Sequence, residues 1–464
     1  MKLSFYGGTG EATGANYILE SAPAADGSTT KIMVDCGLHQ GGHYAEKENF
    51  EPFVYDAKPI AAVFITHSHL DHIGRLPSLV RAGFTGKIYS TGATKDFAEL
   101  MLLDSEHLLA KEAEREAKPP LYTNEDIEHV GRLWEGLNYH EIVTVGPFKV
   151  ELFDAGHILG SAIVKIDVTE DDGHGSAAIK TIVFSGDLGN FPAPIIQPTE
   201  FIDTPVDYCV IESTYGDRIH ENVDQRKEQL ERAIESTVKA GGTLMIPTFA
   251  MERTQELLYH MHQLFEEGSI PRVPVFIDSP LAIKLTAVYK KHESYFNKET
   301  EAIARTGDDI LNFPGLRLTL TTEQSKEIND VKPPKVVIAG SGMSNGGRIL
   351  HHEQRYLPDP KSTILFVGYQ ANGSLGRQIL DGAQEVKIFG ETIPVRCKVI
   401  NIPGYSAHAD QPRLLQWLGH MRGSLKKVFV VQGEPQSSAT LAQKIVDNFA
   451  VKAEVPTQNE SVEL

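Results

Sequence analysis

The sequence predicts an α/β protein with a sizeable buried core, and three observations indicate this class. The chain has 464 residues, of which 41% are hydrophobic and 40 are glycine. Short apolar segments alternate with turns through the first part, and from about residue 216 a strand, a loop and a helix follow one another repeatedly. The length is large for one domain and sufficient for two.

The first part of the chain contains short strands and two helices. Strands are expected at 3–6, 16–20, 31–35, 61–66, 87–89, 148–153, 162–168 and 180–185. A helix is expected at 95–117, where Glu and Lys are spaced for i,i+4 pairing, and Pro119 and Pro120 end it. A second helix is expected to start near Thr123, in a sequence typical of a helix cap.

The later part of the chain repeats a strand and a helix. Such pairs are expected at 243–247 and 252–265, at 273–277 and 281–289, at 335–339 and 347–355, and at 363–369 and 377–380. This repeat predicts a parallel sheet wrapped by helices. The last section returns to strand character at 395–402 and 427–431.

Composition narrows the function classes. The net charge of −18 argues against broad electrostatic binding to nucleic acid, although metal ions and a locally basic cleft could still attract a nucleic-acid substrate. No apolar run approaches the roughly 18 residues of a membrane span, and the N-terminus lacks a signal-peptide core. Three widely spaced cysteines argue against a disulfide framework and for a reducing cytoplasm.

A dense group of histidines and an aspartate follows the apolar run 61–65. His67, His69, Asp71 and His72 lie within six positions, and imidazole and carboxylate are the ligands that zinc takes in catalytic centres. The pairs His67/His69 and Asp71/His72 offer enough donors for two ions. The alternative interpretation is a solvated polar loop.

Two single residues extend this group. His157 stands between glycines after one expected strand, and Asp187 stands at the end of another. Each alone is a weak signal, because a lone histidine is more often structural than a ligand. Together with the first cluster, all at strand ends, they predict one metal centre.

This constellation resembles the metallo-β-lactamase superfamily, whose HxHxDH motif is matched by His67, His69, Asp71 and His72. The later His and Asp of the family match His157 and Asp187, and its early aspartate matches Asp35. The resemblance implies an αββα sandwich with one zinc on His67, His69 and His157. It implies a second zinc on Asp71 and His72, with Asp187 bridging the ions. It also implies that Asp35 fixes the tautomers of the ligand histidines.

A finer resemblance is to the β-CASP nucleases. Glu212 stands in a stretch similar to their motif A, His408 in one similar to motif B, and 246–253 and 340–347 resemble parts of their inserted domain. The resemblance implies a core formed by 1–212 and 396–464, with a β-CASP domain inserted at 213–395. It is closest to the short bacterial RNA-processing nucleases, which lack the extra C-terminal domain of ribonuclease J and the KH domains of archaeal homologues. A homodimer is an expectation from this resemblance alone.

One position departs from the family. RNA-cleaving members carry a histidine ligand for the second zinc in motif C, and this chain has Gln432. The amide oxygen of Gln432 is a poorer zinc ligand than imidazole. The second site is therefore expected to be weaker or to take a harder ion such as Mn²⁺. DNA-directed members typically carry valine here, so Gln432 does not assign the chain to them.

The predicted centre suits phosphodiester hydrolysis. Two metal ions generate hydroxide at neutral pH and neutralise charge on an in-line phosphoryl transition state. Asp71 is included among the catalytic candidates. His408 is the candidate acid for the leaving oxygen, with Glu212 orienting it and raising its pKa. The alternative for His408 is a structural hydrogen bond in a turn.

Several residues are candidates for holding phosphate. The glycine-rich stretch 340–347 precedes a predicted helix and could bind phosphate through backbone amides, although it has no Walker lysine and a plain tight turn is the alternative. Arginine suits bidentate phosphate contacts, with surface salt bridging as the alternative. The predicted substrate-binding set is Arg253, Ser341, Gly342, Met343, Ser344, Ser374 and Arg377, with His351 and His352 as further cleft liners.

The leading hypothesis is a zinc-dependent ribonuclease that acts in an interdomain cleft on single-stranded RNA, with endonucleolytic action expected and 5′-exonuclease action left open. A DNA nuclease or a small-molecule ester hydrolase is the alternative within enzymes, and the motif A and B stretches count against the second of these. An inactive RNA-binding subunit is the alternative from another class. Only one ligand position departs from the family pattern, which favours activity.

Overall fold

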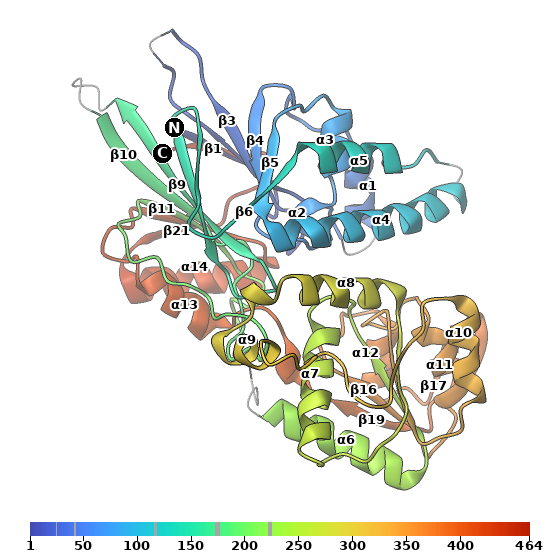
Figure 1. Ribbon diagram of the computed structural model, residues 1–464. Helices are drawn as coiled ribbons and strands as arrows, with labels where there is room; N and C mark the ends of the chain where they lie inside the picture. Colours follow the sequence, from blue (N-terminus) through green and yellow to red (C-terminus); the bar gives the residue numbers. More distant parts are fainter. Residues whose placement is uncertain (25, 41–42, 116–117, 172–176, 221–224) are drawn as a thin grey trace. The chain divides into compact units, whose positions relative to one another are not determined.

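The computed structural model describes residues 1–464 except 25, 41–42, 116–117, 172–176 and 221–224. The chain forms two compact units (Figure 1). The first unit contains Met1–Phe191, Pro198–Ile219 and His408–Leu464. The second contains Pro192–Gln197 and His220–Ala407.

Two sheets form the middle of the first unit. One has the strand order β22-β1-β2-β3-β4-β5-β6 and the other β21-β20-β11-β10-β9-β8-β7. The strands of the first sheet are β1 (Lys2–Gly7), β2 (Asn16–Glu20), β3 (Lys31–Cys36), β4 (Ile60–Phe64), β5 (Lys87–Thr91), β6 (Trp134–Leu137) and β22 (Ser461–Glu463). The strands of the second are β7 (Ile142–Val145), β8 (Phe148–Asp154), β9 (Ala162–Asp171), β10 (Ala177–Phe184), β11 (Tyr208–Glu212), β20 (Lys427–Val431) and β21 (Lys452–Glu454).

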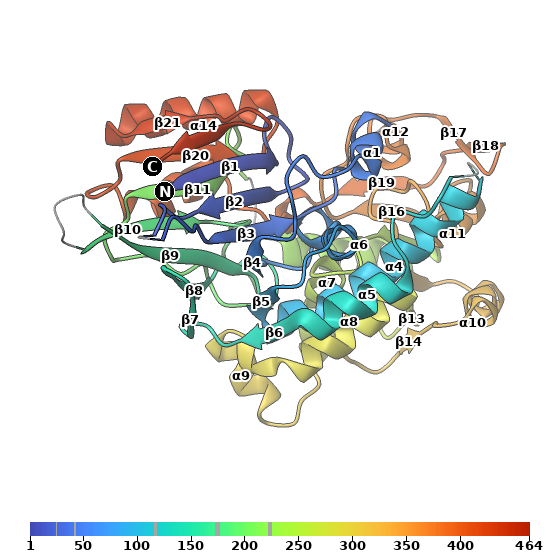
Figure 2. The same cartoon turned by 90° about the horizontal axis from the view of Figure 1, so that it is seen from above.

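Helices cover the outer face of each sheet (Figures 1 and 2). The helices of this unit are α1 (His43–Phe50), α2 (Leu70–Ile73), α3 (Leu76–Arg81), α4 (Gly92–Arg115), α5 (Asn124–Leu133), α13 (Gln411–Gly419) and α14 (Pro435–Phe449). Because strand side chains alternate between faces, Phe64 of β4 packs between the sheets whereas Val63 packs toward α2–α5. In β10, Phe184 faces the intersheet core and Val183 faces α13 and α14. These layers confirm the predicted αββα sandwich.

The second unit is built on a parallel sheet of order β14-β13-β15-β12-β16-β19. Every residue of β12 and β15 is buried, as expected for strands covered on both faces. The strands are β12 (Thr243–Pro247), β13 (Val275–Asp278), β14 (Leu316–Leu318), β15 (Lys335–Ala339), β16 (Thr363–Phe366) and β19 (Lys398–Asn401), with an antiparallel pair β17 (Glu385–Ile388) and β18 (Glu391–Pro394). The helices are α6 (Arg226–Ala240), α7 (Arg253–Glu266), α8 (Pro280–Lys291), α9 (Lys298–Ala304), α10 (Thr322–Glu327), α11 (Ile349–Tyr356) and α12 (Leu375–Leu380). The predicted parallel α/β domain is confirmed.

The sequence interpretation missed several helices, among them the long helices α6 and α14 and the helix α13. Both α13 and α14 have proline in the first turn, which is a helix-start signal. Leu414, Trp417 and Leu441 of these two helices are buried in the core beneath the second sheet, so tertiary packing fixes them in place. Among the described helices, none combines the length and the apolar character that crossing a lipid bilayer would require.

Candidate metal centre

The loop after β4 delivers the first group of polar side chains. The strand ends at Phe64, and the chain passes through His67 and His69 before Asp71 and His72 enter the short helix α2. His67 and His72 are fully buried, and Asp71 retains 17% of its side-chain exposure. The loop therefore presents most of its imidazoles to the interior of the first unit.

Asp35 anchors this loop through contacts with Thr66 and His72. It lies at the end of β3 in a left-handed backbone conformation, φ 58°, and is 1% exposed. Its Oδ1 accepts the backbone N–H of Thr66 at 2.8 Å, and its Oδ2 accepts the Thr66 hydroxyl at 2.8 Å. Oδ2 also lies 2.8 Å from His72 Nδ1. Thr66, which the sequence interpretation did not single out, thus ties the loop to Asp35.

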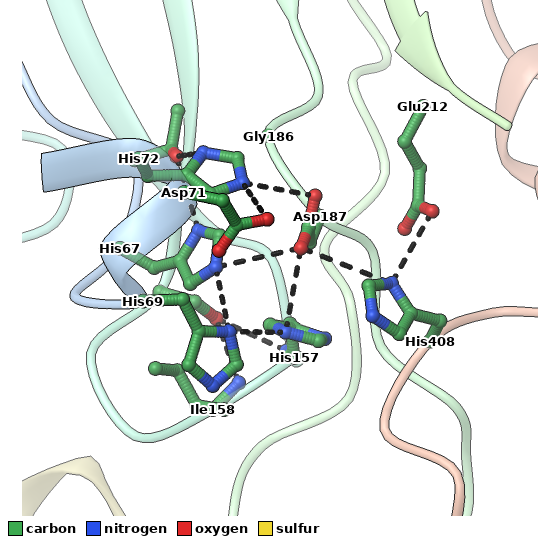
Figure 3. A network of polar contacts seen from close by, with 12 residues as sticks. His67, His69, Asp71, His72, His157, Ile158, Gly186, Asp187, Glu212 and His408 are labelled. Atoms are coloured by element: carbon green, nitrogen blue, oxygen red, sulfur yellow. Dashed lines mark hydrogen bonds and ion pairs between the residues drawn. The ribbon is translucent and has the colours of Figure 1, made fainter. Parts of the chain in front are cut away.

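Four side chains converge on one point (Figure 3). His67 Nε2 lies 3.0 Å from His69 Nδ1, and that atom lies 3.3 Å from His157 Nε2. The carboxylate of Asp187, at the turn after β10, lies 3.4 Å from His67 Nε2 and 3.6 Å from His157 Nε2. Sequence segments some 120 positions apart are therefore brought together at the ends of strands from both sheets.

This arrangement fits a metal cation. A neutral imidazole has one N–H donor and one lone pair, so three imidazole nitrogens facing each other cannot all be satisfied by hydrogen bonds. Tetrahedral zinc with Zn–N distances of about 2.0–2.1 Å places its nitrogens about 3.3 Å apart, close to the separations seen here. Burial holds the pKa of His67 and of His157 well below the usual range, so both present neutral nitrogens, the form that binds metals.

Asp187 is the common partner of the centre. Burial opposes its ionisation, but the contacts with the surrounding imidazoles, among them the protonated His408, outweigh burial and hold the pKa of Asp187 well below its usual range. Its Oδ1 lies 3.4 Å from His72 Nε2 and accepts a hydrogen bond from Gln432 Nε2 at 3.0 Å. The carboxylate is therefore negative and faces both predicted metal positions.

The second predicted position is arranged differently. Asp71 Oδ2 lies 3.7 Å from His72 Nε2, and Gln432 Nε2 lies 2.8 Å from the same nitrogen. The amide nitrogen of Gln432, rather than its oxygen, points at His72 and Asp187. Among the described residues, neither Asp71 nor His72 belongs to a group of three or more His, Cys, Asp or Glu ligand atoms within 4.8 Å of one another.

His408 and Glu212 lie beside the first position. His408 Nδ1 is 3.3 Å from Glu212 Oε2 and 3.8 Å from Asp187 Oδ2. Burial opposes protonation of His408, but Glu212 and Asp187 outweigh burial and raise its pKa to about 9. Glu212 is fully buried at the end of β11, and its Oε1 accepts the Leu188 N–H at 2.6 Å. His408 is 25% exposed, so it is a protonated group within reach of a ligand.

The predicted substrate-binding residues lie in the second unit. The guanidinium of Arg253 pairs with Glu252 at 2.7 Å and Glu256 at 3.2 Å and is 11% exposed. Arg377 pairs with Asp381 at 2.9 Å. The two arginines therefore have carboxylate partners within the unit, and their phosphate role stays a prediction.

The hydroxyls predicted to hold phosphate also have local partners. Ser344 is fully buried and donates to Glu353 at 2.5 Å. Ser341 accepts a backbone N–H of its own loop at 3.1 Å, and Ser374 caps α12. His352 lies 2.8 Å from Asp278 and is 3% exposed. The remaining members of the predicted set are Gly342, Met343 and His351.

Gly37 gives the metal loop the space that it occupies. A Cβ at this position would lie 1.6 Å from the Asp71 carbonyl oxygen and 2.1 Å from its carbon. Gly37→Ala is therefore expected to push α2 away, lower the free energy of unfolding by about 1–3 kcal/mol and reduce bound zinc. Denaturant unfolding and elemental analysis would measure both effects.

Gly131→Ala is the matched control for that substitution. Gly131 lies inside α5, and a Cβ there meets nothing within 4 Å. Because alanine favours helix over glycine by about 1 kcal/mol, this variant should be at least as stable as the native protein. Native zinc content and native stability in Gly37→Ala would contradict the packing argument.

Three family models match successive parts of the chain. The metallo-beta-lactamase superfamily model matches residues 17–207, the Beta-Casp domain model matches 254–379, and the model described as Zn-dependent metallo-hydrolase RNA specificity domain matches 392–456. The last of these covers the segment that contributes His408 and Gln432.

Named proteins are similar over most of the chain. Ribonuclease TTHA0252 of Thermus thermophilus is 36% identical over 447 residues, which cover 96% of this chain and 95% of that protein. Transcription termination factor FttA of Methanocaldococcus jannaschii is 28% identical over 100% of this chain and 71% of its own length. A crystal structure of a protein of unknown function from Enterococcus faecalis V583 covers 100% of this chain and 99% of its own, with a TM-score of 0.56 at 14% identity. That last likeness concerns the fold alone.

Proposed function

Because this chain belongs to the β-CASP family of metallo-β-lactamase-fold, metal-dependent hydrolases, we propose that it is a zinc-dependent ribonuclease. The observation that carries the proposal is the convergence of His67, His69, His157 and Asp187 within 4.8 Å, with the His408–Glu212 pair beside it. A similar protein bears the name ribonuclease. We propose single-stranded RNA as the substrate and internal phosphodiester bonds as the points of cleavage.

The residues present suit zinc at the first position, held by His67, His69 and His157 with Asp187 at its side. A bound ion of this kind acts as a Lewis acid, lowers the pKa of water and neutralises charge on a phosphoryl group. The two-metal arrangement expected from the sequence would place a second ion on Asp71 and His72, with Asp187 shared. Gln432 contacts His72 and Asp187, two of the residues that would hold this second ion.

The side chains that remain exposed define where a substrate would meet the centre. Asp71 and His408 are 17% and 25% exposed, and His69 is also partly exposed, whereas Asp187 is only 3% exposed. We propose that His408, which holds its proton at neutral pH, gives that proton to the leaving oxygen of the phosphodiester. Glu212 keeps the imidazole oriented and charged. Asp71 remains a candidate catalytic carboxylate.

The charge of the chain shapes how RNA would bind. With a net charge of −18, the surface as a whole repels a polyanion, so attraction must come from the metal centre and from local groups. The three described cysteines are free and buried, which suits a reducing cytoplasm.

The proposal is tested with 5′-labelled single-stranded RNA and DNA of the same sequence. The purified protein, a chelator-treated sample and a sample given zinc after chelation are compared. RNA is expected to be cut into internal fragments, DNA to stay intact, and activity to vanish on chelation and return with zinc. Cleavage of DNA alone would overturn the substrate, and full activity without metal would overturn the mechanism.

A further inference from the structure

We infer that the amide of Gln432 occupies the second metal position, so that each chain holds one zinc rather than two. The inference rests on the proposed function, because it concerns the same centre. It starts from the place of Gln432 at the end of β20, where its nitrogen lies 2.8 Å from His72 Nε2 and 3.0 Å from Asp187 Oδ1.

With the amide in this orientation, each N–H group of Gln432 has an acceptor. His72 lies 2.8 Å from Asp35 through Nδ1, and donation of the Nδ1 proton to that carboxylate leaves Nε2 as an acceptor. Gln432 has two N–H donors, one for His72 Nε2 and one for Asp187. A reversed amide would place its oxygen about 3.0 Å from the Asp187 carboxylate, two acceptors without a proton between them. The nitrogen must therefore face Asp187.

The backbone around Gln432 fixes this arrangement. The residue is 2% exposed and adopts a left-handed conformation, φ 49°. Its N–H donates to Gly8 O at 2.7 Å, and its carbonyl accepts from Ser213 N at 3.2 Å and Thr214 Oγ1 at 3.1 Å. The main chain is therefore held on both sides of Gln432, and the burial of the residue excludes solvent that could compete for the two N–H groups.

The two positions thus differ in kind. At the first, three imidazole nitrogens and a carboxylate face each other and need a cation. At the second, the lone pairs of His72 and Asp187 already have donors, and a cation there would have to displace the Gln432 amide. The N–H group that faces Asp187 replaces part of the positive charge that a second ion would bring to this carboxylate.

Metal content tests this directly. Zinc-loaded protein is dialysed against metal-free buffer, and zinc per chain is measured by elemental analysis and native mass spectrometry. The native chain is expected to retain one zinc. Gln432→His, which replaces the amide by an imidazole, is expected to retain two, and X-ray absorption should then show a zinc–zinc distance that the native protein lacks.

A matched control separates the site from adventitious binding. Gln436→His places the same new side chain on an exposed position of α14, and this variant should retain one zinc. Two zinc ions in the native chain, or one in Gln432→His, would overturn the inference while leaving the proposed ribonuclease intact. A native chain with no zinc would overturn the proposed function and this inference together.

Discussion

Asp187→Asn is expected to lower kcat/KM for RNA cleavage by at least about 10³-fold, because several kcal/mol of charge stabilisation depend on this carboxylate. Asp187 lies within 4 Å of His67, His72, His157 and His408. An amide of the same shape removes the negative charge and turns an N–H₂ group toward imidazole lone pairs. Zinc content should fall with activity, and steady-state kinetics with elemental analysis would measure both.

Asp167→Asn is the control for this loss. Asp167 lies in β9 of the same unit, and its carboxylate contacts Lys165 and Thr181 at 2.7 Å instead of the histidines. Activity and zinc content should stay near those of the native protein. If Asp187→Asn kept native zinc and native kcat/KM, the assignment of Asp187 to the metal centre would be wrong.

His408→Ala is expected to lower kcat by about 10²–10⁴-fold, the usual contribution of a general acid, while zinc content stays unchanged. The imidazole lies 3.3 Å from Glu212 and 3.8 Å from Asp187 Oδ2, but it does not belong to the group of metal-ligand candidates formed by His67, His69, His157 and Asp187. Loss of the side chain therefore removes a proton donor and spares the metal ligands.

The leaving group distinguishes this role from a structural one. A phosphodiester with a p-nitrophenyl leaving group needs little protonation, so His408→Ala should lose much less activity on it than on RNA. His420→Ala is the control, because His420 also pairs with a carboxylate, Asp203 at 3.2 Å, but is 41% exposed at the end of α13. An equal loss on both substrates, or loss of zinc, would exclude His408 as the acid.

Most of the metal-binding residues could be predicted from the sequence because several of them lie close together in the chain. His67, His69, Asp71 and His72 are neighbours in the chain, and an apolar strand directly before them indicates where they are placed. The αββα layers were implied by the resemblance to the metallo-β-lactamase superfamily. The convergence of His157 on the same point depends on strand order, which periodicity alone does not specify.

The partners of the polar groups were harder to predict than their positions. Arg253 suggested a phosphate contact, whereas the structure pairs it with Glu252 and Glu256, and the i,i+3 spacing to Glu256 in the predicted helix 252–265 already allowed that pairing. Gln432 was expected to offer an oxygen to a metal. The direction of its amide is decided by Asp187, which lies 245 positions earlier in the chain. Hydrogen-bond direction in a buried site is a property of tertiary structure.

The pairing of β20 with β11 means that parts of the centre are synthesised at different times. A chain made from its N-terminus produces the histidine cluster early, then the whole of the second unit, and only afterwards His408 and Gln432. Until β20 is in place, β11 lacks one of its two neighbouring strands and the metal centre lacks Gln432. The His408–Glu212 pair and the contacts of Gln432 can therefore form only after the whole of the second unit has been made.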